Sequence, residues 1–185
     1  VRGHLDVFET STTEQRETID LVGDELDTMS RYVADLLVLA KAEQPDFLRL
    51  EAIDVGEFAH QLVPRLTALG DRTWRTERVP EPGRTAVVAD PGRLAQAVLN
   101  LAGNAVEHTG PGDEIELTIA VHADRYRIQI RDTGPGFDDT VADGLFRRHE
   151  RGGRSRVSRP DGTGIGLSIV AAIARAHGGA VSATG

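Results

Sequence analysis

Apolar residues in the first forty positions repeat at alternating steps of three and four. Polar residues fill the positions between them, which is the pattern of an α-helix with one apolar stripe. A lone helix cannot bury such a stripe, so we expect this one to pack against a second helix and against another subunit. Docking on its own domain is the alternative, and a stripe of about three heptads favours the bundle. The stripe consists of Ile19, Val22, Leu26, Met29, Val33, Leu36 and Ala40.

Hydroxyl residues precede this helix and predict a turn. Ser11, Thr12 and Thr13 are typical of such a turn, and Ser11 followed by Glu14 three positions later has the form of a capping box. Residues 1–8 are therefore expected to be the stub of an earlier helix.

A tripeptide containing proline ends the helical pattern. Gln44-Pro45-Asp46 interrupts it, because proline lacks an amide donor and disfavours helix in the residue before it. The sequence therefore predicts a domain boundary here, with a helical part over residues 1–44 and a second domain over residues 47–185.

Period-two alternation after the linker predicts strands. Ile115, Leu117, Ile119 and Val121 alternate on one strand of a hairpin, and the second strand returns through residues 126–130. The order of elements fits a mixed sheet covered on one face by helices, so the fold class is α+β and the architecture a two-layer sandwich. Further strands are expected near residues 48–53, 73–79 and 85–89, and helices near residues 55–69, 92–108 and 165–177.

Composition and charge narrow the function classes. The chain has 185 residues, a net charge of -8 and no cysteine, which excludes disulfides and thiolate metal sites. No run approaches the ~20 apolar residues of a membrane span, so a soluble piece is expected. The acidic balance argues against a general nucleic-acid binder. Positive charge is nevertheless concentrated locally, with six arginines between residues 147 and 159.

Three short segments rich in glycine or asparagine follow one another in the second half of the chain, at residues 100–109, 132–137 and 162–167. Each alone is a weak signal, because short glycine patterns arise by chance and asparagines often hydrogen-bond within a core. Their order and spacing together predict a nucleotide pocket.

The first and third segments suggest how such a pocket is built. Asn100, Asn104 and His108 recur at steps of four, so they project from one face of a helix. The glycines of residues 162–167 open another helix, where free backbone N–H groups and the positive end of the helix dipole favour an anion such as a triphosphate.

These segments resemble the N box and the two glycine boxes of the catalytic ATP-binding region of sensor histidine kinases, in the superfamily that includes gyrase, Hsp90 and MutL. Leu145-Phe146 resembles the phenylalanine box that opens the nucleotide lid of that family. The resemblance implies a Bergerat-type two-layer α/β sandwich, preceded by a dimerising helical hairpin of which residues 1–44 would be a part.

The resemblance also implies ATP and Mg²⁺ as ligands, with defined roles for several residues. Asn104 would supply an amide oxygen to the magnesium ion. Asp132 would accept a hydrogen bond from the exocyclic amine of adenine, which favours ATP over GTP. Gly134 and Gly136 would let the chain turn beside the base. Asn100 stands where ATP-hydrolysing members carry a glutamate general base, and an amide cannot accept that proton, which favours phosphoryl transfer over hydrolysis.

The lid and the second glycine box complete the implied site. Arg148 and Arg151 match basic lid positions that approach the phosphates, and together with Asn100 they are the catalytic candidates; the other lid arginines fit a solvated loop. The remaining residues assigned to ATP binding are His108, Phe146, Gly162, Thr163, Gly164, Ile165, Gly166 and Leu167.

The phosphate acceptor of the family is missing from this sequence. The family's acceptor histidine is followed by an acidic residue and, five positions on, by a proline. His4 has Leu5 and Glu9 at those positions, and His149, although followed by Glu150, lacks the proline. Autophosphorylation of the chain by the usual route is therefore not expected.

Three departures from the family pattern concern the site itself. Glu107 stands where the family generally has a basic residue near the phosphates, and a carboxylate there would repel them unless it points away. His149-Glu150 replaces an aromatic pair at the end of the phenylalanine box. The sequence also stops at Gly185, before the family's final strand.

The resulting hypothesis is the ATP-binding catalytic region of a bacterial two-component sensor histidine kinase, which transfers the γ-phosphate of ATP to a histidine outside this chain or in a longer protein. Expected partners are a second copy through the helix of residues 19–40, or a histidine-bearing hairpin, and a response regulator. The expected location is the cytoplasmic portion of an inner-membrane sensor, with membrane contact only through segments not in this sequence. The alternatives are a noncatalytic nucleotide-binding and dimerisation module and an anti-sigma-type serine kinase, which would lack the long heptad helix.

Overall fold

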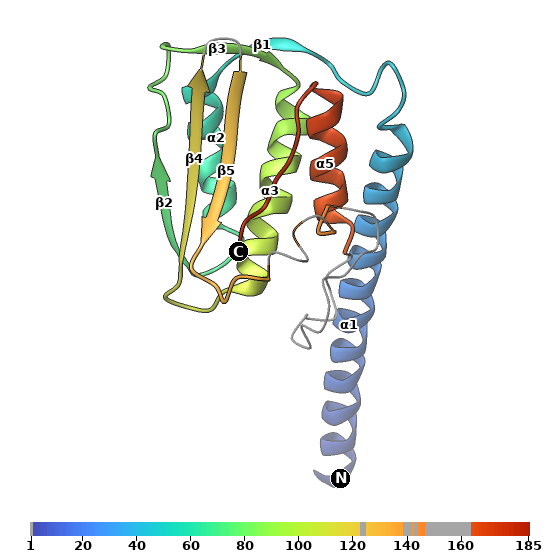
Figure 1. Ribbon diagram of the computed structural model, residues 1–185. Coiled ribbons are helices and arrows are strands. Elements are labelled where there is room, and N and C mark those ends of the chain that lie inside the picture. Colours follow the sequence, from blue (N-terminus) through green and yellow to red (C-terminus); the bar gives the residue numbers. More distant parts are fainter. Residues whose placement is uncertain (1, 123–124, 139–141, 143, 147–163) are drawn as a thin grey trace. The chain divides into compact units, whose positions relative to one another are not determined.

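The computed structural model describes residues 2–122, 125–138, 142, 144–146 and 164–185 (Figure 1). The chain divides into two compact units, Val1–Leu37 and Val38–Gly185. The helix α1 (Arg2–Lys41) makes up the first unit and ends within the second. The predicted boundary at residues 44–46 lies shortly after the end of α1, and as a domain boundary it stays a prediction.

The predicted turn near residues 11–13 is wrong. The backbone of α1 is helical from Arg2 to Lys41 without interruption, so there is neither a separate stub nor a capped second helix. Serine and threonine only mildly disfavour helix, and no proline occurs before Pro45. Hydroxyl residues therefore do not break a helix unless their side chains find a capping geometry.

The apolar stripe of α1 is open to solvent in the single chain. The exposed fraction of Leu26 is 57% and that of Val33 is 58%, values far above those of the residues in the second unit's core. Among the residues that the structure describes, no helix is both long and apolar enough to cross a bilayer.

In the part of the second unit that the structure describes there are two sheets, where the sequence predicted one mixed sheet. Strands β1 (Glu51–Asp54) and β3 (Ala86–Ala89) pair with each other in antiparallel orientation. The other sheet has the order β2-β4-β5, with β2 parallel to β4 and β5 antiparallel to it. Its strands are β2 (Thr73–Glu77), β4 (Glu114–His122) and β5 (Arg125–Asp132). The mixed character is thus confirmed for this three-stranded sheet, while β1 and β3 form a separate ladder.

Among the described residues of the second unit, the helices α2 (Val55–Thr67), α3 (Pro91–His108) and α5 (Gly166–Ala176) accompany these sheets. The helices α2 and α3 begin at aspartate caps: Asp54 accepts a hydrogen bond from the amide of Glu57 at 2.7 Å, and Asp90 accepts one from the amide of Arg93 at 2.9 Å. Pro91 at the first position of α3 fits that start, because its missing N–H would have had no partner there.

One hydrophobic core lies between the three-stranded sheet and the helices α2 and α3. On β4 the side chains alternate, and Ile115, Leu117 and Ile119 are almost completely buried. Leu62 and Leu66 of α2 are buried to the same extent. Burial of each such side chain stabilises the fold by about 1.5–3 kcal/mol. This packing fixes one face of α3 against the sheet through Ala95, Val98 and Ala102.

A second core joins the opposite side of α3 to α5 (Figure 1). Ile169 and Ile173 of α5 are buried against Ala97 of α3, together with Phe47 from the segment after α1. The guanidinium of Arg93 lies 4.4 Å from the centroid of the Phe47 ring, a cation–π contact that covers this aromatic. The helix α3 is therefore held on two sides, and what it carries is positioned rigidly.

Candidate nucleotide-binding site

The predicted asparagine and histidine positions lie on the C-terminal half of α3. Ala102 and Ala105 face the core, whereas Asn100 and Asn104 are half-buried and His108 is exposed. Small alanines on the buried face let α3 approach its neighbours closely, which leaves the polar residues on the face that looks out of the core. The structure thus places the three N-box residues on one helix at the predicted spacing.

Asn100 meets the second glycine segment. Its side-chain amide nitrogen lies 3.4 Å from the carbonyl oxygen of Gly166, in a long hydrogen bond across 66 positions of sequence. A side chain at Gly166 would place its Cβ only 3.7 Å from the amide carbon of Asn100. The first and third predicted segments therefore lie side by side.

The helix α5 begins at an apolar N-cap residue. Ile165 occupies that position and is 7% exposed, and its side chain carries no polar group that could cap the helix. Gly164 before it has a φ of +64°, a left-handed conformation that favours glycine. The first amides of a helix have no partner within that helix, so this end fits an anion.

The second segment turns tightly at the end of β5. The Asp132 side chain accepts a hydrogen bond from the amide of Gly134 at 2.9 Å, and the Asp132 side chain is exposed. A Cβ at Gly134 would lie 2.8 Å from the carbonyl oxygen of His108 and 3.4 Å from Cγ2 of Thr109. Only glycine permits this approach, so the loop after β5 rests directly on the end of α3.

Gly136 and Phe137 lie beside the last residue of the chain. Gly136 has a φ of +65°, and its Cβ position would be 3.5 Å from the carbonyl carbon of Gly185. Residues 179–185 have no strand assignment. The loop that follows Asp132 is thus bordered by α3 on one side and by the C-terminal segment on the other.

Two further predicted positions lie near the limits of the described residues. Phe146 is half-buried in a turn, in which the amide of Leu145 donates to the carbonyl of Ala142 at 3.4 Å. Glu107, which departs from the family pattern, is exposed on the last turn of α3. The predictions for Arg148, His149, Glu150, Arg151, Gly162 and Thr163 lie outside the described residues.

Asp90, which was not among the predicted site residues, anchors the other end of α3. Its side chain accepts from the amide of Arg49 at 2.8 Å as well as from that of Arg93. Burial by itself would raise the pKa of Asp90, but the backbone donors and the positive charge of Arg93 outweigh it, so the pKa is lowered. An aspartate directly before a proline is a helix-start signal that could have identified this cap.

His177 joins the start of α3 to the end of α5. The amide of Asp90 donates to Nε2 of His177 at 3.1 Å, and Nδ1 of the same ring lies 2.9 Å from the carbonyl oxygen of Ile173. Together these contacts assign the hydrogen to Nδ1, because Nε2 must accept. The ring therefore has a structural role that supports the second core.

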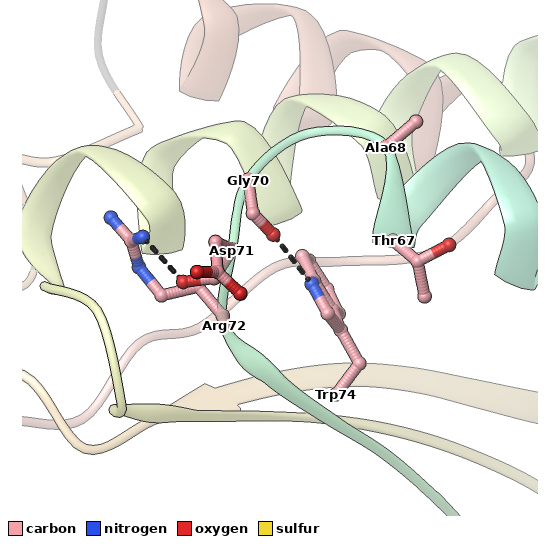
Figure 2. A pocket seen from close by; sticks show the side chains of 6 residues that line it. All are labelled: Thr67, Ala68, Gly70, Asp71, Arg72 and Trp74. Atoms are coloured by element: carbon pink, nitrogen blue, oxygen red, sulfur yellow. Dashed lines mark hydrogen bonds between the residues drawn. The ribbon is translucent and has the colours of Figure 1, made fainter.

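A hollow of about 590 Å³ lies beside the turn between α2 and β2 (Figure 2). It is lined by Thr67, Ala68, Gly70, Asp71, Arg72 and Trp74. None of these belongs to the predicted nucleotide residues, so the hollow is distinct from the site around α3 and α5.

The described side chains around α3 offer few ligands for a metal ion such as Mg²⁺. Among the described residues there is no cluster of three or more His, Asp or Glu side chains that would hold an ion without other ligands. Mg²⁺ commonly retains water and takes oxygens from phosphates, so one amide oxygen is a sufficient protein contribution. Asn104, half-buried on the polar face of α3, fits that role.

Comparison with known proteins gives the family. The profile described as histidine kinase-, DNA gyrase B- and HSP90-like ATPase matches residues 89–185, which span α3, the β4-β5 hairpin and α5. A probable sensor histidine kinase, TcrY from Mycobacterium tuberculosis, is 33% identical over 162 residues, which cover 87% of this chain and 34% of that protein. The chain spans roughly a third of the length of several curated relatives.

Solved structures of similar fold support the same family. The full-length ShkA structure in complex with AMPPNP has a TM-score of 0.70 and 30% identity, and the match covers 93% of this chain and 36% of that one. The mycobacterial sensor histidine kinase MprB has a TM-score of 0.60 and 27% identity, over 72% of this chain and 84% of that one. The chain therefore belongs to the family of histidine kinase-, DNA gyrase B- and HSP90-like ATPases, and it is similar to the sensor histidine kinases TcrY and MprB.

Proposed function

We propose that this chain transfers the γ-phosphate of ATP to a histidine that it does not itself contain. The observation that carries the proposal is the meeting of three segments around α3: Asn100 against Gly166, and the Asp132–Gly134 turn against the end of the helix. One end of this arrangement offers a carboxylate acceptor and the other the N-terminal start of α5. That separation suits a ligand with a base at one end and phosphates at the other.

The adenine would lie at Asp132. One carboxylate oxygen of Asp132 accepts from the amide of Gly134, and the side chain is exposed. A carboxylate that faces the base accepts from the exocyclic amine of adenine and disfavours the carbonyl of guanine. The ATP-analogue complex of the structural relative ShkA supports a nucleotide of this kind for the shared fold.

The phosphates would lie at the start of α5. Its first amides and the positive end of the helix dipole favour an anion there, and Gly164 and Gly166 keep side chains away from that approach. Arg148 and Arg151, assigned by resemblance, would add positive charge from the lid. Glu107 would have to remain directed toward solvent, and its exposure is consistent with that.

Asn104 would hold a magnesium ion together with the phosphates. When bound, the ion would neutralise charge on the phosphates during transfer. The remaining contribution of the protein is positioning: the two cores hold α3 and α5, and thereby keep Asn104 and the start of α5 in a fixed relation.

The proposed transfer forms a bond between a histidine ring nitrogen and the γ-phosphorus. The bond from that phosphorus to the β–γ bridging oxygen breaks, and ADP leaves with the electron pair. Asn100 supports transfer over hydrolysis, because an amide cannot take a proton from water at neutral pH. Its hydrogen bond to Gly166 instead gives it a role in joining the two helices.

The chain would act as a homodimer, or with a separate histidine-bearing hairpin, and would serve a response regulator. The exposed apolar stripe of α1 supports association through that helix. The region would be the cytoplasmic portion of an inner-membrane sensor, joined to the membrane by segments outside this sequence.

The test is incubation of the chain with γ-labelled ATP and magnesium, alone and with helical hairpins that carry an acceptor histidine. We expect acid-labile, alkali-stable label on a hairpin and none on the chain itself. The variant Asn104→Ala should remove most of this transfer, whereas Gln61→Ala, an exposed change on α2, should leave it intact.

Two results would contradict the proposal. Label on no hairpin, after several have been tried and ATP binding has been shown separately, would favour a noncatalytic nucleotide-binding and dimerisation module. Release of inorganic phosphate without any labelled protein would indicate hydrolysis in place of transfer.

A further inference from the structure

The helix α3 ends without the usual backbone cap. Its C-cap residue, Thr109, has φ -119° and ψ 167°, an extended conformation that closes no left-handed capping turn. The last four carbonyl oxygens of a helix have no partner within it and need one from elsewhere. In α3 these carbonyls belong to the last turn, which borders the loop of residues 133–137 after β5. This loop is the adenine loop of the proposed site.

Arg72, the residue directly before β2, provides much of that cap. Its Nη2 donates to the carbonyl of Val106 at 3.1 Å and to that of Thr109 at 2.8 Å, while its Nε donates to Oγ1 of Thr109 at 2.9 Å. The hydroxyl of Thr109 in turn donates to the carbonyl of Ala105 at 2.7 Å. A guanidinium suits this role because its donors form a rigid planar fork and its charge is favourable at the negative end of a helix.

The guanidinium is itself held in place. Nη1 of Arg72 donates to the carbonyl of Asp71 at 2.9 Å, and the indole of Trp74 donates to the carbonyl of Gly70 at 3.2 Å (Figure 2). A Cβ at Gly70 would lie 3.0 Å from a methyl group of Val106, so the turn that carries Arg72 rests closely on α3.

The capped end of α3 is also the surface on which the adenine loop rests. Gly134 lies against the carbonyl of His108 and the methyl group of Thr109, and the amide of Gly134 donates to the Asp132 side chain. A contiguous set of contacts thus leads from Arg72 through Thr109 to Gly134 and Asp132. No contact of Arg72 with a nucleotide is needed for this.

We propose that Arg72 is a positioning residue for adenine recognition: by capping α3 through Thr109, it holds the Gly134 turn and thereby fixes the direction of the Asp132 carboxylate. The inference rests on the proposed function, since it takes Asp132 as the adenine acceptor. Loss of the cap would let the end of α3 fray and the Asp132 carboxylate shift.

The variants are Arg72→Ala, Arg72→Lys and the control Arg75→Ala. Lysine keeps the positive charge but lacks the planar set of guanidinium donors, so Arg72→Lys should retain only part of the capping of α3. Arg75 lies three residues further along the chain, on β2, where it pairs with Glu114 of β4 at 2.8 Å and its side chain is largely exposed. It controls for the removal of a nearby arginine.

The first measurement is the affinity for ATP relative to inosine triphosphate, in which a carbonyl replaces the 6-amino group. We expect Arg72→Ala to lower this preference about tenfold, Arg72→Lys to lower it less, and Arg75→Ala to leave it unchanged. In an Asp132→Asn background, Arg72→Ala should have little further effect on the preference. A merely structural role would lower the melting temperature and weaken the binding of both nucleotides equally, so that the preference for ATP would not change.

The second measurement is hydrogen exchange at the amide of Gly134 in the protein without nucleotide. We expect faster exchange in Arg72→Ala than in Arg75→Ala. Unchanged exchange, or an unchanged ratio of affinities in Arg72→Ala while the wild type prefers ATP, would overturn the inference about Arg72 alone. A wild type without preference for ATP would contradict the adenine role of Asp132 in the proposed function, and the exchange at Gly134 would still decide whether Arg72 positions the loop.

Discussion

At the scale of single residues, the site depends on close approaches between segments. A Cβ at Gly134 would collide with the carbonyl of His108, whereas a Cβ at Gly166 would make an ordinary contact of 3.7 Å with Asn100. These glycines serve contact between segments as much as chain turning. Asp132 differs from these glycines because it offers a functional group: its side chain is exposed at the end of β5 and accepts a hydrogen bond from the amide of Gly134.

The affinity for ATP should depend on the Asp132 carboxylate. Asp132→Asn should weaken ATP binding about tenfold to a hundredfold, since the amide nitrogen would face the adenine amine in place of an acceptor. Titration of ATP by calorimetry measures the change. Asp71→Asn removes the same charge from an exposed loop and should leave the affinity unchanged. Equal affinity of Asp132→Asn and wild type would show that the base lies elsewhere.

At the scale of elements, α3 positions the site because both of its ends are capped and two of its sides are packed in hydrophobic cores. Its start is capped by Asp90, its end by Arg72 and Thr109, and its sides by the two cores. The cap at Asp90 also holds the segment after α1, through the amide of Arg49. A single carboxylate therefore stabilises two elements.

The lowered pKa of Asp90 sets the sign of a pH effect. A carboxyl whose pKa is lower in the folded state adds to the free energy of unfolding above its unfolded value of about 3.9, and this contribution is lost as pH falls through the folded pKa. We expect Asp90→Asn to be less stable than wild type at pH 7, with a difference that shrinks below about pH 4. Urea unfolding at several pH values measures it. A difference that stays constant with pH would mean that the charge of Asp90 contributes nothing.

At the scale of the whole molecule, the two units differ in what they bury. The second unit encloses two cores, whereas the first exposes a continuous apolar stripe on α1. Exposed apolar area of this regularity is typical of a surface that another helix covers. Association is thus the expected role of the first unit, and nucleotide binding that of the second.

A charge in the middle of the stripe should separate the subunits. Leu26→Glu places a carboxylate at a position that is 57% exposed in the single chain, so it should not harm the fold of the monomer. We expect a shift from dimer to monomer in sedimentation equilibrium. Val88→Glu, at a position of β3 that is 66% exposed, should leave the mass measured by sedimentation equilibrium at the wild-type value. A Leu26→Glu protein that stays dimeric would exclude the stripe as the interface.

Much of the element order was predictable, because local spacing decides it. Alternation identified the β4-β5 hairpin, and the predicted helix near residues 92–108 agrees with α3 to within one residue at its start. The predicted turn at residues 11–13 was wrong, since side chains that can cap a helix can also be accommodated inside one. The separate β1-β3 ladder was missed, because strand pairing is decided by long-range packing and not by alternation.

The sequence by itself determined the family, the three segments rich in glycine or asparagine and the amphipathic helix, because each is encoded in residues close together along the chain. Only the tertiary structure decided which residues support them. Arg72 meets Thr109 across 37 positions, and His177 meets Asp90 across 87. Such contacts form when folding brings distant polar groups together and each buried donor or acceptor must find a partner, and no local pattern records them.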